Sequence, residues 1–212
     1  MKASWLIPVA IASGLAWMLG VLLIATQAPS EPVGAAYDLY NRLLTIAILL
    51  LLVTAIGIRR NLAQSNTASA TAALGLAVGV GLMAAGNLLE FWGALLAGQP
   101  PSATAARLGT EEFWGSTPGF FVFLAGSVVA TVALIVIGVR SRRWYGVSSV
   151  EALLIGAAGI LMSASTALWA VSPAAALVPA ALFAFGWMSL ARATAGHAGA
   201  GSQRAASQPT ES

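Results

Sequence analysis

The sequence predicts an all-α membrane protein built as a bundle of six transmembrane helices. Of its 212 residues, 58% are hydrophobic and only 8% are charged, against about 25% charged residues in an ordinary soluble domain. A soluble fold of this size needs more polar surface than such a composition supplies. The apolar residues also occur in stretches of about 20, the length that a helix needs to cross roughly 30 Å of hydrocarbon.

Six such stretches define the predicted helices. Their approximate boundaries are 5–26, 39–58, 68–97, 119–139, 149–171 and 173–193. Together they form a predicted transmembrane domain of residues 1–195. Residues 196–212 are small and polar and include a proline, so they cannot bury enough apolar surface to order themselves. We therefore expect a disordered cytoplasmic tail there.

The first helix has two interpretations. Lys2 precedes an apolar run that begins at Trp5, and a cleavage site after Ala28 would make the run a signal peptide. However, the run is about 20 residues long, whereas the apolar region of a signal peptide has about 7–15. We interpret it as a membrane anchor; cleavage would leave five helices.

The ends of the later helices carry recognisable capping patterns. Thr117 and Pro118 place a capping residue before a first-turn proline at the fourth helix, and Ser172 and Pro173 do so at the sixth. The segment 148–151 reads Ser-Ser-Val-Glu, which is typical of a capping box at the start of the fifth helix. The short connection between the fifth and sixth helices predicts that they are antiparallel neighbours.

The basic residues predict the orientation. With the N-terminus in the cytoplasm, eight of the ten lysines and arginines lie on the cytoplasmic side and two, Arg42 and Arg107, lie outside. The opposite orientation inverts this ratio, so the positive-inside rule predicts that both termini are cytoplasmic. We accordingly expect a multi-pass protein of a bacterial cytoplasmic membrane.

Scarce residue types exclude several functions. The chain has no cysteine, its one histidine is His197 in the polar tail, and its one lysine is Lys2. Thiolate metal sites, an intramembrane histidine base, bis-histidine haem ligation and a retinal Schiff base therefore lack their side chains. No phosphate-binding glycine motif follows a predicted strand. We expect no enzymatic activity, no cofactor and no metal, and the helix-end arginines do not indicate nucleic-acid binding.

Glu90 and Asn87 form the first candidate polar site. They lie one turn apart on the third helix, and ionisable groups in a span usually face a partner or a cavity. Counted from Ala68, Glu90 is about 33 Å along the helix, which places it near the outer surface. It therefore has two interpretations: an interfacial carboxylate, or a group that binds a cation, a proton or a polar ligand.

Asp38 and Arg42 form a second candidate pair. Their four-residue spacing predicts an ion pair at the outer start of the second helix. The structural interpretation is helix stabilisation, which a carboxylate near a helix N-terminus also provides. A functional interpretation requires Asp38 and Glu90 to converge.

The arginines Arg140, Arg142 and Arg143 follow the fourth helix and precede Trp144. They are predicted to mark the cytoplasmic end of that helix and to contact anionic lipid headgroups. Trp17 and Trp187 lie deeper than the interfacial belts and are predicted to pack in the core.

Small residues recur at four-residue spacing and allow helix backbones to approach closely. The pairs are Gly75/Gly79, Gly81/Ala85, Gly126/Ala130 and Gly159/Ser163. They favour packing within the chain, with a homo-oligomer or a protein partner as the alternative.

These observations predict a small polytopic protein without catalytic machinery, acting as a structural or accessory component of the membrane. The alternative is a small transporter or channel that uses Asn87 and Glu90 near the outer face. A polar cavity leading from Glu90 would favour transport, whereas a filled bundle with an apolar groove would favour an interaction role.

Overall fold

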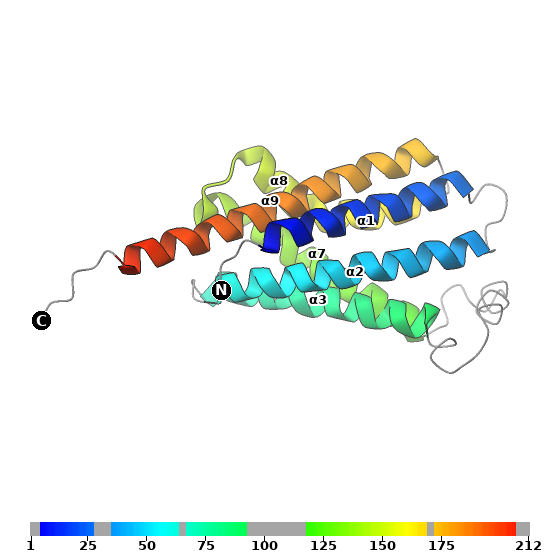
Figure 1. Ribbon diagram of the computed structural model, residues 1–212, viewed down its shortest axis with the longest axis horizontal. Coiled ribbons are helices and arrows are strands. Elements are labelled where there is room, and N and C mark those ends of the chain that lie inside the picture. Colours follow the sequence, from blue (N-terminus) through cyan, green and yellow to red (C-terminus); the bar gives the residue numbers. More distant parts are fainter. Residues whose placement is uncertain (1–4, 28–34, 64–66, 93–117, 169–171, 207–212) are drawn as a thin grey trace, which may run out of the picture.

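The computed structural model describes residues 5–27, 35–63, 67–92, 118–168 and 172–206. Within these residues six helices run along the long axis of the molecule (Figure 1). They are α1 (Leu6–Gln27), α2 (Ala35–Leu62), α3 (Thr67–Phe91), α7 (Pro118–Tyr145), α8 (Ser149–Ala167) and α9 (Pro173–Ala206). Each contains a segment of 19 to 28 residues that is long and apolar enough to cross a membrane. The predicted all-helical class is therefore confirmed, and the described residues contain the six helices of suitable length and apolarity that the sequence predicts.

Some helix ends differ from the sequence-based boundaries. α2 continues through Arg59 and Arg60, and α7 continues through Arg143 to Tyr145. Arginine is a good helix former, so the arginines that end an apolar run do not end the helix itself. α3 ends at Phe91, earlier than predicted.

The largest correction concerns the C-terminal segment. The sequence predicted a disordered tail from residue 196, but α9 continues as a helix to Ala206. The extension contains three glycines, which disfavour helix, but also four alanines, Gln203 and Arg204, which favour it, and the next proline is Pro209. The polar composition of the segment therefore does not end this helix. Residues 207–212 lie outside the described part of the chain.

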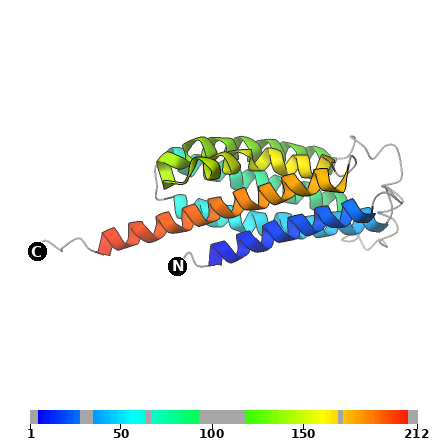
Figure 2. The same ribbon diagram turned by 90° about the horizontal axis from the view of Figure 1, so that it is seen from above.

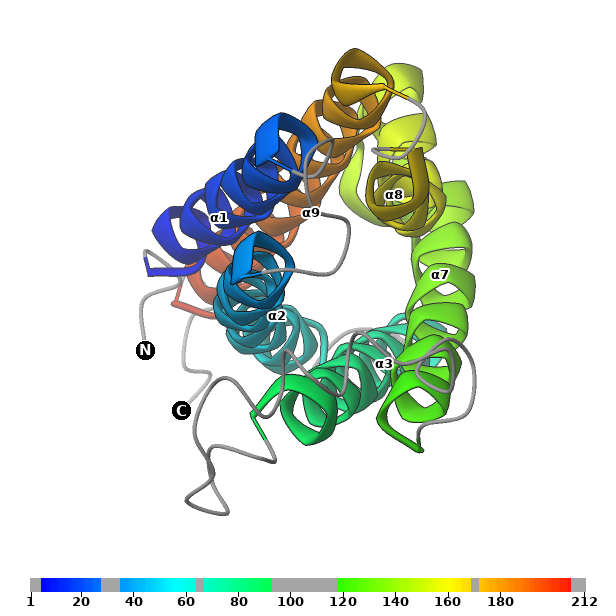
Figure 3. The same cartoon turned by 90° about the vertical axis from the view of Figure 1, so that its right-hand side faces the viewer.

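The six helices form a closed ring when the bundle is viewed from one end (Figure 3). The order around the ring is α1, α2, α3, α7, α8 and α9, and α9 returns to contact α1. Seen from above, α7 and α8 lie on one side of the bundle and α1 lies on the opposite side (Figure 2). The predicted antiparallel pairing of α8 and α9 is confirmed, with Ser172 capping α9 through the backbone N–H of Ala175 at 3.0 Å.

Large apolar side chains from the helices fill the interior of the ring. Trp17 of α1 packs on Phe183 of α9 with ring centroids 5.4 Å apart, and Phe183 packs on Trp187 at 6.2 Å. All three side chains are almost fully buried. The prediction that both tryptophans are core residues is confirmed.

Glycines allow a close contact between α3 and α7. A Cβ atom on Gly79 would lie 2.8 Å from the carbonyl oxygen of Gly126, and one on Gly126 would lie 2.6 Å from the carbonyl oxygen of Gly79. Neither position has room for a side chain, so the two backbones are in direct contact. In lipid, where lipid tails are as apolar as the core, such close dispersion contacts hold helices together.

Candidate functional site

Asn87 binds a neighbouring helix through its side chain. The hydroxyl of Thr45 on α2 donates a hydrogen bond to Oδ1 of Asn87 on α3, and both residues are buried. The same Thr45 hydroxyl lies 2.9 Å from the carbonyl oxygen of Asn41, one turn earlier. Its single proton is therefore offered to two acceptors, one within α2 and one on α3.

Trp92 completes this polar cluster at the end of α3. Its indole Nε1 donates to the Thr45 oxygen at 3.0 Å. The guanidinium carbon of Arg42 lies 5.3 Å from the centroid of the Trp92 ring, within the range of a cation–π interaction. The cluster of Arg42, Thr45, Asn87 and Trp92 thus joins the start of α2 to the end of α3.

The structure brings together only part of the predicted polar site. Asn87 and Arg42 both belong to the cluster, since Thr45 contacts the first and Trp92 contacts both Thr45 and Arg42. Glu90 lies in the last turn of α3 and Asp38 near the start of α2, so both backbones are at this end of the bundle. Their side chains lie outside the described part of the chain, and so does any pairing between Asp38 and Arg42.

Sequence reasoning missed Thr45. A threonine inside an apolar helix commonly bonds to the carbonyl oxygen four residues earlier, and Thr45 does so with Asn41. Its second role, as the group between Asn87 and Trp92, depends on the approach of α3. Nothing in the sequence around residue 45 indicates that approach.

The opposite end of the bundle carries most of the described arginines. They are Arg59 and Arg60 on α2, Arg140, Arg142 and Arg143 on α7, and Arg192 on α9. All six are exposed. They lie at the same end because α2, α7 and α9 run in the same direction (Figure 1). The predicted headgroup residues therefore belong to a larger basic end surface.

Local contacts order the chain beside these arginines. The guanidinium carbon of Arg140 lies 5.7 Å from the centroid of the Trp144 ring. Two residues after the positive-φ turn at Gly146, the Ser148 hydroxyl accepts from the backbone N–H of Glu151 while the Glu151 carboxylate accepts from the Ser148 backbone N–H. The predicted capping box at the start of α8 is confirmed.

Other polar side chains within the helices also connect one helix to another. Nε1 of Trp17 on α1 donates to the Ser165 hydroxyl on α8 at 2.9 Å, and the hydroxyls of Ser127 on α7 and Ser163 on α8 lie 3.2 Å apart. Three of the four predicted small-residue pairs lie at close helix contacts within the chain. These contacts involve Gly79, Gly126 with Ala130, and Gly159 with Ser163. Packing inside one chain thus uses most of the faces that could have served a second copy.

Among the described residues, no group of three or more histidine, aspartate or glutamate side chains is placed to hold a metal ion. No protein-family model matches this chain, and no curated protein or solved structure is similar to it. The geometry of its own residues therefore carries the functional argument.

Proposed function

We propose that the protein is a non-catalytic component of a bacterial cytoplasmic membrane, with six spans and both termini in the cytoplasm. In this role it acts by binding other membrane components. The observation that supports this best is that polar side chains within the helices bond to one another across helix contacts. Thr45 with Asn87, Trp17 with Ser165, and Ser127 with Ser163 each join one helix to another.

The bonding of Asn87 to Thr45 argues against the alternative that Asn87 forms part of a transport site. A transport site needs polar atoms that a substrate can reach, but Oδ1 of Asn87 accepts the Thr45 hydroxyl and Asn87 is only 4% exposed. Two grooves between described helices, one between α3 and α7 and one between α1 and α9, lie on the outer surface of the bundle and are lined mainly by apolar side chains. Both features favour an interaction role over conduction through Asn87.

The orientation is supported by the basic end surface. With that end in the cytoplasm, its six arginines follow the positive-inside rule. Reporter fusions after Ser65, Ala105 and Ser212 test this. We expect cytoplasmic signals at Ser65 and Ser212 and a periplasmic signal at Ala105; a cytoplasmic signal at Ala105 would contradict the orientation.

A flux measurement tests the absence of transport. Purified protein is reconstituted in liposomes that enclose dyes for protons, sodium and potassium. We expect flux no greater than in protein-free liposomes, for the natural chain and for Glu90→Gln alike. A flux that the natural chain supports and that Glu90→Gln or Asn87→Ala abolishes would replace the proposal with the transporter alternative.

A further inference from the structure

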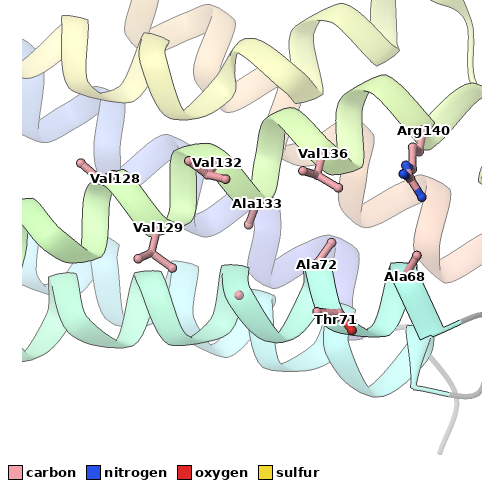
Figure 4. Close-up of a pocket in the computed structure, with 10 residues that line it drawn as sticks. Ala68, Thr71, Ala72, Val128, Val129, Val132, Ala133, Val136 and Arg140 are labelled. Carbon is pink, nitrogen blue, oxygen red and sulfur yellow. The ribbon is translucent and has the colours of Figure 1, made fainter.

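An apolar groove runs along the outer surface between α3 and α7, with a volume of about 550 Å³ (Figure 4). One wall is a row of valines on α7, Val128, Val132 and Val136, each one turn after the last. The other wall includes Ala72 and Gly75 of α3. Small residues on α3 leave the groove open, and the side chains of Val128 and Val132 are 56% and 55% exposed.

Arg140 ends the groove. It is the next member of the same row, four residues after Val136, and its side chain lies at the end of the line of valines (Figure 4). The one carboxylate whose side chain the structure describes, that of Glu151, is bound to the backbone N–H and hydroxyl of Ser148. Arg140 is exposed and rests on Trp144, so its charge faces outward at the groove end.

The length of the groove matches one leaflet of a bilayer. From Val128 to Arg140, α7 rises about 18 Å, and half of a hydrocarbon core is about 15 Å. With Arg140 at the headgroup level, the valines therefore extend to about the middle of the membrane. Trp144 lies one turn beyond Arg140, where interfacial tryptophans are enriched.

A second surface groove provides a comparison. It lies between α1 and α9, has a similar volume of about 540 Å³, and is lined by apolar side chains that include Leu15, Leu19 and Ala181. No charged side chain lines it. Any apolar chain fits such a surface, whereas the α3–α7 groove adds a cation at one end and therefore selects an occupant that is apolar along its length and anionic at its end.

We propose that the α3–α7 groove binds one anionic phospholipid, with an acyl chain along the valine row and the headgroup phosphate at Arg140. This inference rests on the proposed membrane location. In the proposed orientation the groove opens to the cytoplasmic leaflet, where anionic lipids attract basic residues. The bound lipid covers apolar surface that the bundle leaves exposed and neutralises the arginine.

Native mass spectrometry of the full chain in detergent tests the proposal. The probes are phosphatidylglycerol and phosphatidylcholine with identical acyl chains. We expect the natural chain to bind phosphatidylglycerol more tightly, and Arg140→Gln to lower that preference about fivefold, the factor contributed by one arginine near an anionic surface. Arg59→Gln is the matched control, because Arg59 is exposed at the same end but is not part of the groove.

Filling the groove tests the apolar half of the site. A Cβ atom on Gly75 would meet only the Ala133 Cβ, at 3.6 Å, and Gly75 lines the groove. We therefore expect Gly75→Leu to fold and to fill part of the groove with its side chain. We expect this variant to lose binding of both lipids while keeping its melting temperature. Ala181→Leu, in the uncharged groove, is expected to leave the preference unchanged.

Three results would overturn the proposal. The first is that Arg140→Gln leaves the preference for phosphatidylglycerol unchanged, and the second is that Arg59→Gln lowers this preference as much as Arg140→Gln does, which would assign the effect to the whole basic end. The third is that Gly75→Leu abolishes a dimer and leaves lipid binding unchanged, which would assign the groove to a second copy of the chain. Because the measurement is made in detergent, its outcome does not depend on orientation. A failure of the reporter or flux experiments is thus distinguishable from a failure here.

Discussion

The indole Nε1 of Trp17 donates a hydrogen bond of 2.9 Å to the hydroxyl of Ser165. Trp17 lies on α1 and Ser165 on α8, and in the ring these helices are separated by α9. The bond therefore crosses the interior and joins the first helix to the second half of the chain. Both residues are fully buried, so water does not compete for either group.

This bond predicts a difference between two buried tryptophans. Trp17→Phe and Trp187→Phe remove similar volumes from the core, but only the Trp17 nitrogen has a hydrogen-bond partner among the described residues. We expect Trp17→Phe to lower the free energy of unfolding by about 1 kcal/mol more than Trp187→Phe, the net value of one hydrogen bond. Thermal unfolding in detergent measures the difference; equal losses would show that the Trp17–Ser165 bond adds nothing.

The α3–α7 contact predicts opposite effects at two glycines of the same helix. At Gly79 an added Cβ would collide with the backbone of α7, whereas at Gly75 it would make an ordinary contact. We expect Gly79→Ala to destabilise the protein by about 1–3 kcal/mol through overpacking. Gly75→Ala should be neutral or stabilising by up to about 1 kcal/mol, because alanine is the better helix former. Melting temperatures compare the two, and a harmless Gly79→Ala would mean that the helices are less closely packed.

The polar cluster predicts energetic coupling between Thr45 and Asn87. Each of Thr45→Val and Asn87→Ala breaks the same interhelical hydrogen bond, so the double variant should lose less stability than the sum of the two. We expect a coupling energy of about 0.6 kcal/mol, with an upper value of about 1.7, as for hydrogen bonds between membrane helices. A double-mutant cycle on unfolding free energies measures it. Strict additivity would remove the structural role assigned to Asn87.

The C-terminal part of α9 predicts where the chain can be shortened. The described core contacts of this helix extend to Thr194 and Ala195. Truncation after Gly196 keeps those contacts, so we expect an unchanged monodisperse peak on size-exclusion chromatography. Truncation after Trp187 is the control; it removes Leu190 and Ala191 from the core and should abolish the peak. Loss of the peak in the longer variant would show that residues beyond Gly196 support the fold.

The sequence by itself determined the six helices and several of their ends. Length and apolarity specify a membrane helix because every backbone group in hydrocarbon must be bonded within its own segment. Local chemistry likewise specified the capping box of Ser148 and Glu151, since both partners lie within one turn. The arginines, by contrast, do not mark the helix ends, because they indicate where the apolar stretch stops and not where helical hydrogen bonding stops.

The tertiary structure alone decided which helices are neighbours and which polar groups meet. In a soluble protein the apolar face of a helix identifies its buried side, but in a membrane the lipid and the core are equally apolar. The valines of α7 that line the groove are therefore indistinguishable in sequence from those that could fill the core. Asn87 was identifiable as a polar residue in a span, but its partner Thr45 lies 42 positions away on another helix. Only the approach of α2 and α3 brings them together, and that approach depends on side-chain shape along the whole length of both helices.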